Sequence, residues 1–125
     1  MDAGKNAAEA VVQRQLDAYN ARDIAAFIAV WADDAQCFEH PAKPLARGVD
    51  EIRARHELRF REANLHARLV HRMSVGNTVI DREVVTRTFP EGPGTIDVIA
   101  IYEVAHGKIA NAWFIYGAPV LEKAG

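Results

Sequence analysis

The sequence predicts a single α+β domain in which three N-terminal helices pack on one face of a curved, mostly antiparallel sheet. Apolar residues recur at helical spacing in the first half of the chain and alternate with polar residues, as in strands, in the second half. The chain has 125 residues, and half of them are apolar, which suits one domain with its own core. We expect this domain to span residues 7–118, with tails at residues 1–6 and 119–125.

Three helices are predicted in the first half. The first runs from about Ala7 to Ala21, where one apolar stripe is formed by Ala8, Val12, Leu16 and Tyr19. Asp23 is a suitable N-cap for a short second helix, whose apolar positions are Ile24, Phe27, Ile28 and Trp31. Residues 36–40 are predicted as a short strand that leads into a proline-broken loop. The third helix begins near Val49 or Asp50, with one side formed by Ile52, His56 and Phe60.

Four strands are predicted in the second half, at residues 65–75, 78–89, 95–104 and 108–116. In the first of them the apolar side chains fall mostly on the odd-numbered residues. Turns at residues 76–77, 90–94 and 106–107 connect the strands into a meander. The last two strands are apolar on both faces. Because large exposed apolar patches are rare in monomers, we expect the outer sheet face to form a homodimer.

Composition narrows the class of protein. The 15 basic and 17 acidic residues give a net charge of −2, without the basic excess of a nucleic-acid-binding domain. Cys37 is the single cysteine, which is typical of a reducing compartment. The sequence contains neither a signal-peptide pattern nor a membrane-spanning apolar run, so we expect a cytoplasmic protein without a membrane partner. No spacing fits a metal site or a phosphate loop, and we expect no cofactor.

Several short segments resemble one known family when they are taken in order. They are Asp23-Ile24, Ala32-Asp33-Asp34-Ala35, Gly48 with the helix after it, Asp97-Val98-Ile99 and His106-Gly107-Lys108-Ile109. Over about residues 7–117 the chain resembles the nuclear transport factor 2-like superfamily, in its ketosteroid isomerase and SnoaL-like branch. The resemblance implies a cone-shaped fold with a pocket for a small hydrophobic molecule.

The resemblance also implies site residues. The catalytic base of the isomerases falls on Glu39, and an aromatic residue that supports the oxyanion hole falls on His56. The tyrosine and the protonated aspartate of that hole fall on Gln15 and Ala100. Losing one oxyanion donor typically lowers the rate ~10²–10³-fold, so steroid isomerisation is not expected. The chain instead resembles an isomerase or lyase that abstracts a proton next to a carbonyl of a hydrophobic or polyketide-like substrate.

Alternatives remain open at these positions. A bend at Pro41 could turn His40 inward in place of Glu39. His56 is either a pocket donor or general acid, or a core histidine bonded to a carbonyl. The pocket walls, or alternatively the core, are predicted to include Tyr19, Trp31, Phe60, Val98, Phe114 and Tyr116.

One face of the strand 78–89 carries Asp81, Glu83 and Arg87. These residues could form a relay that activates water, as in epoxide-hydrolase relatives of the fold, which would make the protein a hydrolase. Otherwise the strand is a wet edge with weak ion pairs. A third alternative is a non-catalytic binding or assembly module. The arginines of the third helix are interpreted as a solvated face that pairs with Glu57 and Glu62.

Overall fold

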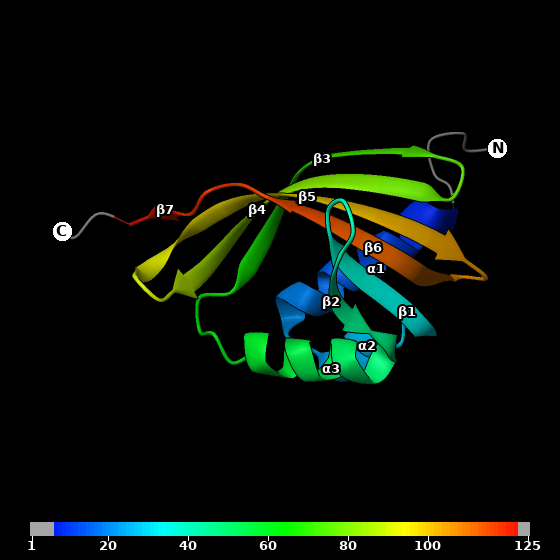
Figure 1. Cartoon of the computed structure of the whole chain (residues 1–125), viewed down its shortest axis with the longest axis horizontal. Coiled ribbons are helices and arrows are strands. Elements are labelled where there is room, and N and C mark those ends of the chain that lie inside the picture. Colours follow the sequence, from blue (N-terminus) through cyan, green and yellow to red (C-terminus); the bar gives the residue numbers. More distant parts are fainter. Residues whose placement is uncertain (1–6, 123–125) are drawn as a thin grey trace.

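The fold combines three helices with one seven-stranded sheet (Figure 1). The structure, a computed structural model, describes residues 7–122, so the expected tail at residues 1–6 lies outside the described residues. The helices are α1 (Ala7–Ala21), α2 (Ile24–Ile28) and α3 (Gly48–Arg59). The strands are β1 (Trp31–Glu39), β2 (Lys43–Arg47), β3 (His66–Val75), β4 (Thr78–Phe89), β5 (Gly92–Ala105), β6 (Lys108–Tyr116) and β7 (Val120–Leu121).

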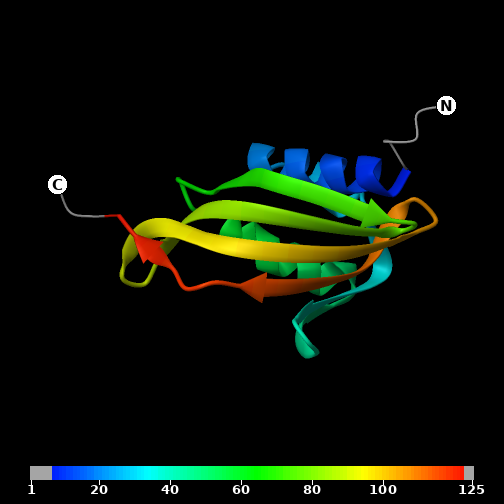
Figure 2. The same ribbon diagram turned by 90° about the horizontal axis from the view of Figure 1, so that it is seen from above.

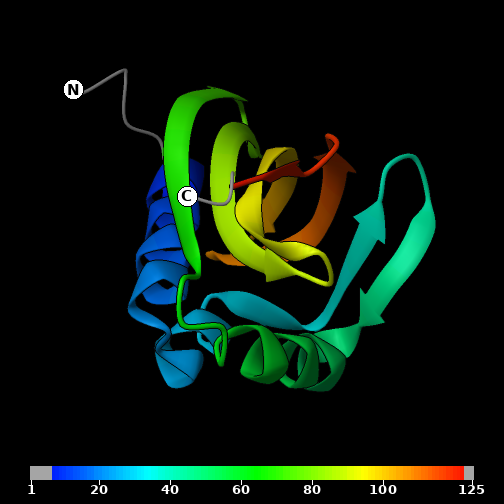
Figure 3. The ribbon, with the colours of Figure 1, turned by 90° about the vertical axis from the view of Figure 1, so that its left-hand side faces the viewer.

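The strands follow the order β2-β1-β6-β5-β4-β3, with β7 paired to β5. Only the β1–β6 pair is parallel among the strands of residues 7–122. The sheet curves strongly (Figures 2 and 3). α1 packs against β3, whereas α3 packs against β1 and β2. The predicted α+β architecture is therefore confirmed.

The helices form largely where the apolar spacing predicts them. Asp23 caps α2 by accepting a hydrogen bond from the Ala26 N–H at 3.1 Å. The prediction that Trp31 continues this helix is wrong, because α2 ends at Ile28 and Trp31 begins β1. The Ile109 N–H donates to the Val30 carbonyl at 2.8 Å, which joins the chain to β6 at this point.

The expected loop after residue 40 contains an edge strand instead. β2 pairs antiparallel with β1 and places Pro44 opposite Phe38. An edge strand tolerates proline, since its outward N–H groups need no partner in the sheet. Gly48 then begins α3 with a φ of +81°, a conformation that favours glycine.

A bulge in β3 reverses the expected alternation of that strand. The register shifts between Leu69 and His71, so that Arg72 lies opposite Asp81. The interpretation that all odd-numbered residues share the apolar inner face is therefore wrong beyond Leu69. Met73 and Val75 are 53% and 86% exposed, whereas Arg72 is largely buried.

Residues 120–121, which lie in the expected tail at residues 119–125, pair with β5. Val120 and Leu121 form β7 opposite Thr95 and Gly94. A Cβ atom on Gly94 would lie 2.4 Å from the Val120 carbonyl oxygen, so this close pairing requires glycine.

The outer sheet face carries exposed apolar side chains. Ile99 and Ile115 are 36% and 40% exposed, and Phe38 stacks on Trp113 with a centroid separation of 5.8 Å. Dimerisation through this face stays a prediction. Within residues 7–122 no helix is long and apolar enough to cross a membrane.

Candidate functional site

A cavity lies between α1, α3 and the inner face of the sheet. The space inside it that a water-sized sphere can reach is about 70 Å³. The predicted site residues that line it are Gln15, Tyr19, Trp31, His56, Glu83, Arg87, Val98, Phe114 and Tyr116. The cavity therefore brings together side chains from both helices and four strands.

Two central candidates do not line the cavity. Glu39 shares the inner face of β1 with Cys37 and lies opposite Phe114, but it is the last residue of the strand. The β1–β2 hairpin projects beyond the rest of the sheet there, which leaves Glu39 half-buried outside the cavity (Figure 3). His40 is exposed, and its backbone N–H donates to the Phe114 carbonyl at 2.8 Å.

Three further candidates also lie outside the lining. Phe60 follows α3 and packs edge-on against Tyr19 and Phe27, with centroid separations of 5.6 Å to each. Ala100 and Asp81 face each other across β4 and β5, and both are completely buried. These residues support the wall rather than form its surface.

Glu83 is the acidic residue on the cavity wall. It lies between Leu69 of β3 and Val98 of β5 and is 7% exposed. Burial among these side chains, with the nearby charge of Asp81, raises the pKa of Glu83 to about 7, while Arg72 acts in the opposite direction. Among residues 7–122, no hydrogen bond or ion pair engages the Glu83 carboxylate. Its oxygens are therefore available to a ligand.

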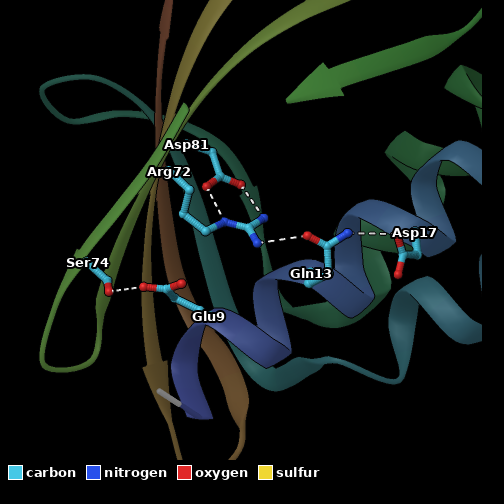
Figure 4. Close-up of polar contacts among 6 residues, drawn as sticks. All are labelled: Glu9, Gln13, Asp17, Arg72, Ser74 and Asp81. Carbon is cyan, nitrogen blue, oxygen red and sulfur yellow. Dashed lines mark hydrogen bonds and ion pairs between the residues drawn. The ribbon is translucent and has the colours of Figure 1, made fainter. Parts of the chain in front are cut away.

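Asp81, which precedes Glu83 by two residues on β4, is held by a bidentate ion pair (Figure 4). The Arg72 Nε and Nη2 atoms donate to the two Asp81 oxygens at 2.7 and 2.9 Å. Arg72 Nη1 also donates to Gln13 Oε1 at 2.8 Å, and Gln13 donates to Asp17 at the same distance. The Arg72–Asp81 pair thus links β3 and β4 to α1. A hydrogen bond from Ser74 to Glu9 is a second link between β3 and α1.

The expected relay of Asp81, Glu83 and Arg87 is not assembled. Arg87 Nη2 donates instead to Glu62 at 2.7 Å, and Glu62 also accepts from the Thr88 backbone N–H at 3.1 Å. The pairing of Glu62 with an arginine of the third helix is therefore wrong, whereas the exposed Arg53–Glu57 pair forms at 3.9 Å.

His56 is a buried, neutral imidazole. Burial lowers its pKa to about 3, and its Nδ1 atom lies 2.8 Å from the Ile52 carbonyl oxygen. Because a carbonyl only accepts, we assign the proton to Nδ1, which leaves Nε2 as an acceptor. His56 is thus the carbonyl-bonded histidine of one interpretation and a cavity-lining residue of the other.

Two buried polar atoms of cavity residues have no partner within residues 7–122. They are the Trp31 Nε1 donor and the Gln15 Oε1 acceptor, on side chains that are 1% and 6% exposed. Unpaired buried polar groups cost about 1–3 kcal/mol each, so these two atoms lower the stability of the folded state. The Tyr19 hydroxyl is also buried, which raises its pKa, and hydrogen-bonds with Arg59.

Sequence reasoning missed Arg55 and Arg59, which both line the cavity. They lie three and seven residues after the buried Ile52, so helical spacing puts them on the same face as His56. That spacing is a usable signal, although charged side chains on a helix more often indicate a solvated face. The other missed lining residues are Leu16, Cys37, Ala67, Val85, Ile96 and Tyr102.

Cys37 also lines the cavity. Burial raises the pKa of the Cys37 thiol to about 12, which keeps it protonated at neutral pH. Residues 7–122 contain no group of three histidine, cysteine or acidic side chains placed to hold a metal ion.

Comparisons with solved structures agree with this architecture. An uncharacterized cystatin fold protein from Novosphingobium aromaticivorans is 27% identical, with a TM-score of 0.79 over 90% of this chain and 99% of that chain. An LEH-like epoxide hydrolase of M. tuberculosis is 15% identical, with a TM-score of 0.77 over 89% and 83% of the two chains. A putative polyketide cyclase from Sinorhizobium meliloti is 21% identical, with a TM-score of 0.71 over 88% and 99%.

The family follows from the sequence match together with the fold. No curated protein matches the chain. The model of the SnoaL-like domain matches residues 12–112, which cover most of the helices and all but the end of the sheet. Structural neighbours include proteins with a nuclear transport factor 2-like or ketosteroid isomerase-like fold. The chain therefore belongs to the SnoaL-like domain family, and it has the fold of nuclear transport factor 2-like proteins.

Proposed function

We propose that the protein is an acid–base enzyme that binds a small hydrophobic molecule and abstracts a proton next to its carbonyl, with Glu83 as the base. One observation carries this proposal: a buried carboxyl group with a pKa of about 7 lies on the cavity wall without a partner. A general base works best when its pKa lies near the operating pH. Glu83 meets that condition.

The developing negative charge needs hydrogen-bond donors. When Glu83 removes the proton, the electron pair of the broken C–H bond moves onto the carbonyl oxygen as an enolate. The Arg59 guanidinium lines the same cavity and is a charged donor. Fixed donors of this kind in a dry site are the main means of stabilising such an oxyanion. Protonated Glu83 then returns the proton to another atom.

A second candidate function is hydrolysis. The M. tuberculosis protein of similar fold is an epoxide hydrolase, and Glu83 could equally deprotonate a water molecule. The proton-abstraction proposal is favoured because Arg87 is engaged by Glu62, so the charged relay expected for water activation is missing.

The direct test is hydrogen exchange in D₂O. A panel of hydrophobic ketones is incubated with the protein, and deuterium incorporation next to the carbonyl is followed by NMR. We expect protein-dependent incorporation into those ketones that bind in the cavity. Ketones that bind without exchange, together with an epoxide that is opened, would favour hydrolysis instead.

Stability should report the buried carboxyl group independently of any substrate. The folded pKa of Glu83 is raised from 4.5 to about 7, so the folded state loses stability as pH rises through this interval. The shift corresponds to about 3 kcal/mol above pH 7 and to none below pH 4. We therefore expect Glu83→Gln to gain about 3 kcal/mol in unfolding free energy, relative to wild type, between pH 4 and pH 8.

Urea unfolding of both proteins at the two pH values measures this difference. Glu91→Gln changes an exposed turn residue and serves as the matched control, for which we expect a difference within ~0.5 kcal/mol. If the Glu83→Gln difference is equally small, the carboxyl group is solvated and the proposed base is wrong.

A further inference from the structure

Two arginines of α3 face the cavity from neighbouring helical turns. Arg55 and Arg59 are four residues apart, so they lie on one face of the helix, and both are only partly exposed. Both line the cavity opposite the sheet residues Glu83 and Val98. The wall that a hydrophobic ligand would meet therefore contains two guanidinium groups.

Neither guanidinium has an acidic partner within residues 7–122. The ion pairs there engage Arg53, Arg72, Arg82 and Arg87 instead. Arg59 hydrogen-bonds with the Tyr19 hydroxyl, and its pKa is lowered by burial and by the positive charges of Arg87 and Arg55. A buried cation without a counter-charge is costly, and an anion bound beside it removes much of that cost.

The charge of the lining contrasts with that of the chain. The whole sequence carries a net charge of −2, whereas the lining contains three arginines and one acidic residue. Glu62 forms an ion pair with Arg87 and acts on Arg59 only from a longer distance, and within residues 7–122 no acidic side chain forms an ion pair with Arg55. The cavity is thus a positive site within an acidic protein, and it selects negative ligands.

We propose that the cavity takes a hydrophobic carboxylate, whose carboxylate group binds to Arg59 and Arg55 while its apolar body packs against the sheet. This inference rests on the proposed function, since it names the substrate class of the same cavity. The planar guanidinium donates two parallel hydrogen bonds that match the two oxygens of a carboxylate. Trp31, Val98, Phe114 and Tyr116 supply the apolar surface.

A carboxylate fits better than a phosphate ester. Phosphates are usually held at helix N-termini, where backbone N–H groups and the helix dipole favour negative charge. Arg59 is instead the last residue of α3, at the negative end of the dipole. The helix dipole at this end opposes negative charge, and it opposes the two charges of a phosphate dianion more than the single charge of a carboxylate.

Calorimetric titration with three matched probes tests the proposal: 2-naphthoate, its neutral analogue 2-naphthamide and 2-naphthyl phosphate. We expect 2-naphthoate to bind at least tenfold more tightly than either of the others. Arg59→Gln should remove this preference by weakening naphthoate binding at least tenfold, without weakening that of the amide. Arg59→Lys should retain part of the preference, because it keeps the charge but loses the planar fork.

Arg53→Gln is the matched control, because Arg53 lies on the exposed side of the same helix in an ion pair with Glu57. It should bind all three probes as the wild type does. Equal affinity for naphthoate and naphthamide, or unchanged naphthoate binding in Arg59→Gln, would overturn the proposal. A preference for the phosphate would overturn the assignment to carboxylates.

Binding in Glu83→Gln separates this inference from the proposed function. The variant should retain or improve its affinity for naphthoate, since a group that becomes negative near pH 7 has been removed. If the wild-type protein shows no preference for naphthoate, the carboxylate site is wrong, but Glu83 remains a candidate base. If Glu83→Gln exchanges protons at the wild-type rate, the assignment of Glu83 as the base is wrong, but the carboxylate site is unaffected.

Discussion

Replacing Glu83 by glutamine should lower the rate of deuterium exchange next to the carbonyl by ~10²–10⁴-fold, the usual contribution of a general base. The amide cannot accept the proton at neutral pH, yet it has nearly the same shape, so the cavity and its ligand affinity should remain. The exchange rate at saturating ketone measures the loss, and the binding constant of the same ketone shows that the site is intact.

Glu39→Gln is the decisive comparison for this result, because sequence resemblance assigns the base to Glu39 and the structure places that residue outside the cavity. We expect the Glu39→Gln variant to exchange at a rate close to that of the wild type. A large loss in Glu39→Gln with full activity in Glu83→Gln would restore the assignment made by resemblance and contradict the mechanism proposed here.

Replacing Arg72 by methionine should lower the free energy of unfolding by about 3–5 kcal/mol, the typical cost of leaving a buried charge without its partner. Asp81 is completely buried and would lose both hydrogen bonds from the guanidinium group. The link to Gln13 on α1 would be lost as well. Urea unfolding at pH 7 measures the change.

Arg82→Met provides the control. Arg82 follows Asp81 on β4, and its ion pair with Asp97 is exposed and spans 3.8 Å. Exposed pairs contribute only about 0–1 kcal/mol, so we expect a change in that range. Combining Arg72→Met with Asp81→Leu should recover most of the stability, since the unpaired charge is then absent. A loss below 1 kcal/mol in Arg72→Met alone would mean that Asp81 reaches water.

Local patterns were sufficient for much of the fold. The bounds of α1, β4 and β6 agree with the sequence prediction because their apolar periodicity is continuous and turns bound them. The β1–β2 hairpin was not predicted, since β2 is a five-residue edge strand that contains Pro44. Edge pairing of this kind depends on backbone geometry, and apolar alternation does not report it.

The site was predicted less well, for physical reasons that concern particular residues. The family resemblance indicated that Glu39 faces inward, but it did not indicate the position of Glu39 at the projecting end of β1. The bulge after Leu69 determines that Arg72 rather than Arg87 reaches Asp81. No local sequence pattern predicts this bulge. The sequence left open whether Glu83 faces the pocket or a wet edge, because polar residues lie on both faces of the strand 78–89. That Glu83 lacks a partner could be known only once Arg72 and Arg87 were seen to bind other carboxylates.

The proposed mechanism requires Glu83 to be a buried carboxyl group that titrates near neutral pH on the wall of the cavity. NMR titration of protein labelled with ¹³C at the glutamate side-chain carboxyl, with Glu83→Gln used to assign the resonance, measures this pKa. We expect a midpoint of about 7 for Glu83. A midpoint near the ordinary value of 4.5 would show that Glu83 is solvated and would rule it out as the base.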